Sequence, residues 1–300
     1  ILKCRLKDPT TDLKEVYEDI EEDIYFLLGV LNSKLGELAV GILSPKISLG
    51  EGAVAKFPIP KFDDEIKKSI SKIAYTLVED FKNMEFFNES SFHFKGLDLL
   101  NSSEIFISDY SIRFQNFFNM KIEDIYEKER TIDDLISKQP LQNEKNNSND
   151  RDVNEFSDEV VGQKILSYAI GCMMGRYSLD EPGLIYAHAG NQDFDASRYQ
   201  TFPADADGII PLTEMHWFED DATHRIQEFL TAVWGKDTLD ANMQWLAESL
   251  DKKASETAED TIRRYLASKF YKDHMQTYKK RPIYWLFSSG KQGAFQALVY

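Results

Sequence analysis

The sequence predicts a helix-rich α+β fold. Apolar residues recur at helical spacing through much of the first hundred residues and again between residues 222 and 274. Short apolar runs bounded by Gly or Pro, such as residues 283–287, are typical of strands. Because the strand-like runs are short and few, we expect a small sheet mixed with helices.

Length and composition fit a globular chain with more than one domain. The 300 residues are 42% hydrophobic, which is ordinary for a protein with a sizeable core. Residues 139–158 are rich in Asn, Asp and Ser and almost lack aliphatic side chains, which predicts a loop or linker. We therefore expect a small mixed domain with two long helices over 1–100, a helical connector and polar linker over 101–159, and a C-terminal mixed domain over 160–300.

Hydrophobic periodicity places several helices in the first half of the chain. Residues 12–43 carry one apolar face and are predicted to form a long helix that Ser44-Pro45 ends. A Gly- and Pro-rich stretch over 47–59 predicts a strand or two. A second helix follows, and residues 104–138 are again helical in pattern. The apolar positions of the second helix are Ile66, Ile70, Ile73, Leu77 and Phe81.

A further apolar helix is predicted over Val160–Tyr177. Gly171 and Gly175 are four residues apart and would give this helix a smooth face for close packing. Cys172 is expected in the core, and Cys4 is far from it in sequence. No Cys/His cluster has zinc spacing, and the longest apolar stretch, Ile24–Leu43, is interrupted by polar residues that argue against a membrane span. We therefore expect free thiols in a cytoplasmic protein.

The loop-rich residues 178–221 contain one motif with two interpretations. Four residues occupy positions 3, 5, 6 and 12 of an EF-hand-like calcium loop: Asp205, Asp207, Gly208 and Glu214. Position 1 is Pro203, which supplies no ligand, and Pro211 interrupts the loop. We therefore favour a turn that leads into a short strand, and we expect no metal site.

Charge is distributed unevenly along the chain. A net charge of −16 argues against DNA binding through a uniformly basic surface. Between Ile262 and Lys291, however, there are eight Lys or Arg and one acid, Asp273, which gives this segment a net charge of +7. A local asymmetry of this size predicts a basic stripe within an acidic chain.

The basic and aromatic segment 278–291 is the best candidate for a binding site. The cationic cluster Lys279–Arg281 precedes the apolar run Ile283–Phe287, which is predicted to be a buried strand. One interpretation is a core hairpin with a solvated basic edge. The other is a nucleic-acid contact, because cations beside exposed aromatic side chains suit phosphates and bases. The candidate DNA-binding residues are Lys279, Lys280, Arg281, Tyr284, Lys291, Arg263 and Arg264.

Six blocks of the sequence, taken in order, resemble one family of enzymes. Residues 165–178 (ILSYAIGCMMGRYS) and 280–285 (KRPIYW) are similar to segments of large single-chain, type IIG-like adenine-specific DNA methyltransferases, most closely those of BREX phage-defence systems. The other blocks are residues 27–34, 52–60, 89–94 and 202–212. The chain departs from the usual residues of that family at Ala53, Val54, Phe92 and His93.

The resemblance implies the part of such an enzyme that recognises and positions duplex DNA. A catalytic domain elsewhere would then flip one adenine and methylate it with S-adenosylmethionine. The resemblance also implies phage defence by marking host DNA as self, with other proteins of the defence system as partners. We expect the chain to be a piece of a longer protein. A different hypothesis is an acidic scaffold that docks those proteins and touches DNA little, and a weaker one is an acidic DNA mimic.

Motifs for methyl transfer are absent from this sequence. Adenine methylation needs an Asn/Asp-Pro-Pro-Tyr/Phe motif that holds the flipped base, and a glycine-rich strand–turn–helix for S-adenosylmethionine. The chain contains no Pro-Pro pair, and Gly171 and Gly175 follow a helical pattern and not a strand. We therefore expect no catalytic residue, no bound cofactor and no methyl transfer by this chain alone.

Overall fold

The computed structural model describes seven stretches of the chain, which form two compact units. The described residues are 13–43, 56–100, 103–137, 156–188, 193–213, 215–290 and 295–300. Several predicted features lie outside them: Cys4, most of the stretch 47–59, most of the linker at 139–158, Glu214 and Lys291. Residues 56–59, the described end of the stretch predicted to hold a strand or two, contain no strand. The two units group residues by spatial contact, so the domain boundaries expected near residues 100 and 159 remain predictions.

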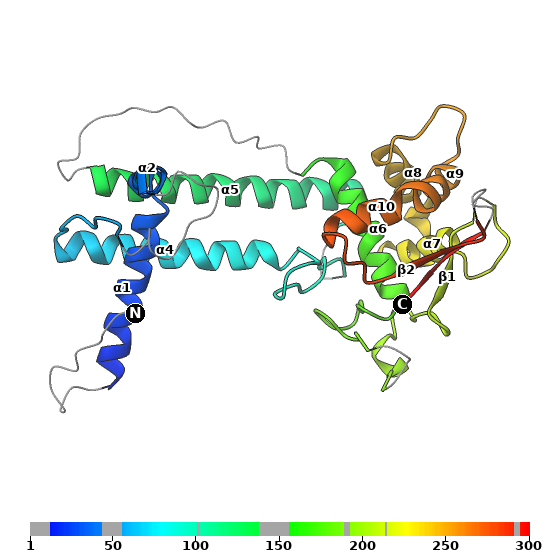
Figure 1. Ribbon diagram of the computed structural model, residues 1–300. Helices are drawn as coiled ribbons and strands as arrows, with labels where there is room; N and C mark the ends of the chain where they lie inside the picture. The colour runs from blue at the N-terminus through cyan, green and yellow to red at the C-terminus, as the bar shows by residue number, and fades with distance from the viewer. Residues whose placement is uncertain are drawn as a thin grey trace. The chain divides into compact units, whose positions relative to one another are not determined.

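Unit 1 comprises residues 1–83 and 120–151, and its described part is mainly helical, with residues 56–63 outside the helices. Its helices are α1 (Leu13–Leu31), α2 (Lys34–Leu43) and the parts of α4 (Asp64–Glu85) and α5 (Ile107–Ser137) that fall within these ranges (Figure 1). The buried residues of its core are Phe26, Val30, Phe57, Ile70, Ile132 and Ile136. The apolar faces predicted from periodicity thus meet in one core, although Phe81 remains 50% exposed.

The single helix predicted over 12–43 is two helices, because the chain breaks at Asn32 and Ser33. The Asn32 side-chain amide donates to the carbonyl oxygen of Leu28 at 2.8 Å. The Ser33 hydroxyl accepts the N–H of Gly36 at 3.2 Å, which satisfies a free donor at the start of α2. α1 and α2 are bent by 73° at this break. None of the described helices is by itself long and apolar enough to span a membrane. Among the described residues, only this bent pair has sufficient length and apolar character when its two helices are taken together.

Unit 2 comprises residues 84–119 and 152–300 and packs its helices around one large apolar core. The first part of α5 lies in this unit. The α-helices that lie wholly within it are α6 (Asp158–Met173), α7 (Ala222–Trp234), α8 (Leu239–Ser249), α9 (Ala258–Tyr265) and α10 (Tyr271–Thr277). Short 3₁₀ turns occur at Ala196–Arg198 and Lys236–Thr238, and a π-helical turn at Leu266–Phe270 joins α9 to α10. The helical content predicted for residues 222–274 is confirmed.

The two glycines near the end of α6 have different roles. A Cβ at Gly171 would lie 2.3 Å from Cδ2 of Tyr177, so this glycine permits the close packing that was predicted. Gly175 has φ +71° and lies beyond the last helical residue, Met173, so the prediction that it lies on the helix face is wrong. It instead terminates the helix in the left-handed conformation that glycine adopts easily. Cys172 is buried in the core as predicted.

The turn predicted within residues 202–212 is confirmed. The Asp205 carboxylate accepts the N–H groups of Asp207 at 3.1 Å and Gly208 at 2.9 Å. The Asp207 carboxylate accepts the N–H of Ile209 at 2.9 Å, where a strand begins. Within the described part of the chain, no three His, Cys, Asp or Glu side chains are grouped so that they could hold a metal ion.

The sheet of unit 2 has three antiparallel strands in the order β1-β3-β2. These are β1 (Ile209–Pro211), β2 (Trp285–Ser288) and β3 (Gln296–Val299), as Figure 1 shows in part. The prediction of a buried strand is wrong for β2, because Trp285 and Phe287 are 61% and 60% exposed. A continuous apolar run does not distinguish a buried strand from an edge strand with one wet face. Helices and a small sheet together confirm the α+β class.

Candidate nucleic-acid interface

The cationic cluster Lys279–Arg281 forms a tight turn directly after α10. Lys279 and Lys280 have φ values of +50° and +64°, which few residues other than glycine adopt. The N–H of Lys280 donates to the carbonyl oxygen of Met275 at 2.7 Å, and that of Arg281 donates to Tyr278 at 2.9 Å. These bonds cap the C-terminus of the helix, so the backbone that carries the three cations has a defined conformation.

The side chains of Lys279, Lys280 and Arg281 are exposed. Within the described residues, none of the three forms an ion pair or a side-chain hydrogen bond. Cations near the C-terminus of a helix are favoured by its dipole, which helps to hold three like charges together. The cluster is therefore free to bind an anion from outside.

Arg263 lies elsewhere and is already paired. It is 5% exposed, and its guanidinium lies 3.2 Å from the carboxylate of the buried Asp221 and 3.0 Å from that of Glu259. Burial alone would raise the pKa of Asp221, but the N–H of His224, the His216 ring and Arg263 outweigh it and lower the pKa. Arg263 therefore compensates a buried charge.

Arg264 is also paired, although it is less buried. Its guanidinium donates to both carboxylate oxygens of Glu256, at 2.8 and 3.0 Å, and to the carbonyl oxygen of Asp251 at 3.0 Å. The hydrogen bond from Arg264 is the main reason that the pKa of Glu256 falls to about 2. Arg264 would have to exchange Glu256 for a phosphate in order to contact DNA.

Tyr284 faces inward, away from Trp285 and Phe287. It is 1% exposed, and its ring stacks on that of His274 with centroids 4.9 Å apart. The His274 Nε2 atom accepts the N–H of Ile283 at 3.1 Å, so the neutral ring carries its proton on Nδ1. Burial, and then the charge of Arg176, lower the pKa of His274 to about 4. Tyr284 and His274 thus anchor the start of β2 from inside the fold, and the buried Tyr284 is not exposed for a contact with DNA.

A buried polar network, which the sequence analysis missed, supports this anchor. The Glu89 carboxylate accepts hydrogen bonds from the Ser167 hydroxyl at 2.8 Å and the Tyr278 hydroxyl at 3.3 Å. The Tyr278 hydroxyl is in turn 3.4 Å from that of Tyr177. Two of the sequence blocks, residues 89–94 and 165–178, thus meet the basic and aromatic segment 278–291 here. Polar residues inside otherwise apolar blocks were the feature of the sequence that could have indicated this network.

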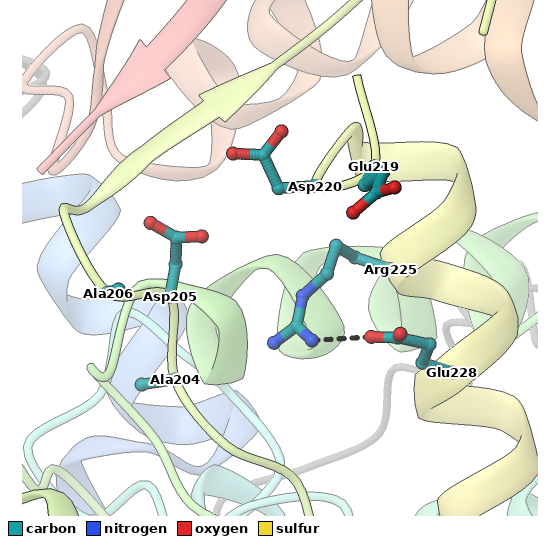
Figure 2. A pocket seen from close by; sticks show the side chains of 7 residues that line it. All are labelled: Ala204, Asp205, Ala206, Glu219, Asp220, Arg225 and Glu228. Carbon is teal, nitrogen blue, oxygen red and sulfur yellow. Dashed lines mark hydrogen bonds and ion pairs between the residues drawn. The ribbon is translucent and has the colours of Figure 1, made fainter. Parts of the chain in front are cut away.

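A separate pocket of about 270 Å³ lies beside α7 and carries mainly acidic side chains (Figure 2). Arg225 donates to Glu228 at 2.5 Å and to the carbonyl oxygen of Pro203 at 2.5 Å. The lining includes Asp205, whose pKa is raised by burial, but no Ser, Cys, His or Lys. Arg225 is already paired within the fold, so apart from this arginine the polar side chains of the pocket lining are carboxylates alone.

Sequence comparison with known proteins relates this chain to two adenine-specific methyltransferases. No family model matches the chain. The chain is 38% identical over 314 residues to the adenine-specific methyltransferase BrxX of Escherichia coli O9:H4 (strain HS), with 93% of this chain and 25% of that protein covered. It is 33% identical over 290 residues to the adenine-specific methyltransferase PglX of Lacticaseibacillus casei (strain Zhang), with 92% and 24% covered. The chain spans about a quarter of the length of these relatives.

Proposed function

Because the chain is homologous to a segment of the adenine-specific methyltransferases BrxX and PglX, we propose that it recognises and positions duplex DNA for methylation. Lys279, Lys280 and Arg281 would contact the phosphates. Methyl transfer from S-adenosylmethionine would be carried out by a different part of the parent enzyme, as a step in defence against phage. The chain alone would be inactive, because its sequence contains neither the base-holding nor the cofactor-binding motif.

One observation supports this proposal above the others. In a chain with a net charge of −16, three consecutive exposed cations stand on a defined turn without an internal partner among the described residues. Phosphate contacts set the register of a protein on a duplex, whereas base contacts specify sequence. A cationic turn of this kind suits the first of these two tasks. Arg264 and Lys291 remain candidates for further contacts, and Arg263 and Tyr284 are buried.

The test is fluorescence anisotropy of the 300-residue chain with random-sequence duplexes, from about 50 to 200 mM salt. The variant is Lys279→Ala/Lys280→Ala/Arg281→Ala. Each lost phosphate contact should reduce the slope of log K against log salt by about 0.9, so the triple variant should lose about 3. A shallower loss of one or two would mean that only some of the cations touch phosphate.

A matched control removes three positive charges elsewhere. Lys61, Lys68 and Lys72 in unit 1 are exposed and form no ion pair among the described residues. Their triple alanine variant changes the net charge equally, so it separates a local contact from the overall charge. Equal loss of binding in both variants would refute the proposed location.

A second function, an acidic scaffold for proteins of the defence system, has an observation of its own. Unit 1 carries an apolar groove of about 380 Å³. It is lined by Leu35, Leu38, Ala39, Ile42, Pro58, Ile59 and Pro60. Exposed apolar surface of this kind often marks a protein contact. Failure of the chain to bind any duplex at about 50 mM salt would favour this function over DNA positioning.

A further inference from the structure

The outer face of the three-stranded sheet presents two large aromatic side chains to solvent. Trp285 and Phe287 are two residues apart on β2, so they lie on the same face. On the opposite face, Leu298 and Ile210 are fully buried in the core of unit 2. Exposed Trp and Phe side chains side by side are unusual on a soluble surface unless they bind something.

The backbone that carries these side chains is fixed. All four residues of β2 pair with β3, and Trp285 is opposite Val299. Beyond the strand, the N–H of Ser289 donates to the carbonyl oxygen of Phe295 at 2.8 Å. Alternate residues of a strand are about 7 Å apart, roughly twice the 3.4 Å rise between stacked bases. The spacing of Trp285 and Phe287 therefore suits bases that are no longer stacked directly on each other.

The cationic cluster immediately precedes these aromatics in the chain. Only three residues separate Arg281 from Trp285. Cations that follow the backbone, combined with aromatic rings on which bases stack, are the usual means of binding unpaired nucleic acid. An intact duplex offers only base edges and phosphates, so it would use the cations and leave both rings unused.

We propose that Trp285 and Phe287 form a stacking platform for an unpaired base in DNA whose phosphates lie on Lys279, Lys280 and Arg281. The chain would then prefer DNA with an unpaired nucleotide over the fully paired duplex. This inference rests on the proposed function for the phosphate contacts, and it adds the class of DNA structure that the same surface recognises. The alternative occupant, an apolar protein surface, is an outcome of the test.

The test compares three fluorescent DNA probes with the 300-residue chain at one salt concentration. The first is fully paired, the second carries a two-nucleotide bulge in the same sequence, and the third is its single strand. Stacking on an aromatic side chain contributes enough per base for about a tenfold preference for the bulged probe. Trp285→Leu/Phe287→Leu should abolish that preference and leave the affinity for the paired probe unchanged. Each single variant should lose part of the preference, which covers the case in which the double variant fails to fold.

The control makes the same two substitutions at other exposed positions, Trp217→Leu and Phe81→Leu, which are 51% and 50% exposed. It should keep the preference for the bulge. Intrinsic fluorescence gives a second readout, because a base stacked on Trp285 should quench it in the wild type and not in Trp285→Leu.

Different failures have different meanings. Salt-dependent binding with equal affinity for the paired and bulged probes would overturn the platform and leave DNA positioning intact. No binding to any probe would overturn both. A platform variant that keeps its preference for the bulge but loses self-association in sedimentation would identify the face as a contact between copies of the chain, and the platform would again fall.

Discussion

The hydroxyl of Tyr278 donates a hydrogen bond to the buried carboxylate of Glu89 at 3.3 Å, across 189 positions of sequence. Tyr278 is the residue from which the cationic turn starts, and the N–H of Arg281 returns to its carbonyl oxygen. The network that Glu89 organises therefore reaches the proposed phosphate contacts through one residue. We expect Glu89 to be a positioning residue for that turn.

Glu89→Gln should change how stability depends on pH. Burial raises the pKa of Glu89, although the hydrogen bond from Ser167 and the charge of Lys164 oppose this. A carboxyl with a raised native pKa contributes stability that is fully present below its unfolded pKa and is lost as pH rises through the native value. Glutamine keeps an acceptor for Ser167 and Tyr278 but cannot ionise. The wild type should therefore lose stability relative to Glu89→Gln as pH rises above about 4.5 in urea unfolding.

For His274 the expected pH dependence of stability has the opposite sign: the wild type should lose stability relative to His274→Phe as pH falls. The pKa of His274 is lowered to about 4, against an ordinary value of 6.5, so the unfolded chain binds a proton that the native one does not. Stability is present above pH 6.5 and is lost as pH falls toward 4, by about 3 kcal/mol over that interval. The phenylalanine variant loses the acceptor for Ile283, which lowers stability at every pH, but its curve should be flatter by that amount. Parallel curves for the two proteins would contradict a neutral native His274.

Periodicity was sufficient for much of the fold. The long apolar stripe of α4 and the repeats of α7 each predicted a helix, because core-facing residues must recur at 3.6-residue intervals. The break at Asn32–Ser33 could not be predicted in this way. Asn and Ser interrupt the apolar pattern only briefly, and the bend depends on side-chain bonds to the local backbone.

The sequence was enough to select a candidate site, but not to show how its side chains are oriented or paired. Composition alone picked out Lys279–Arg281 and the neighbouring aromatic run. It could not tell that Tyr284 faces inward whereas Trp285 faces solvent, because the facing of a strand depends on register with β3. Nor could it tell that Arg263 is opposite Asp221, because that pair is formed between residues 42 positions apart only after folding. A count of charges along the sequence identifies the cations but not the carboxylates with which they pair.

Gly171→Ala should destabilise unit 2. The added Cβ would lie 2.3 Å from Cδ2 of Tyr177 and 2.6 Å from its Cε2, and both residues are buried. Overpacking of a buried site of this kind costs about 1–3 kcal/mol. The control is Gly41→Ala in α2, where the space for a Cβ is empty. That change should stabilise the helix by about 0.5–1 kcal/mol, because alanine is the better helix former. Thermal unfolding followed by circular dichroism measures both, and equal effects would contradict the packing described.

Arg263→Met should strongly destabilise unit 2, because Arg263 is a buried arginine. Removing the guanidinium leaves the carboxylate of Asp221 buried without its cation, for which about 3–5 kcal/mol is expected. Arg264→Met should cost clearly less, because Arg264 and Glu256 are both more exposed than Arg263 and Asp221. The double variant Asp221→Asn/Arg263→Met removes both charges and should recover part of the loss, since asparagine can still cap α7. Additive costs in this double-mutant cycle would show that the two charges do not interact.

The variants Arg263→Met and Arg264→Met also test DNA binding. Only a smaller slope of log K against log salt in Arg264→Met would add this residue to the interface.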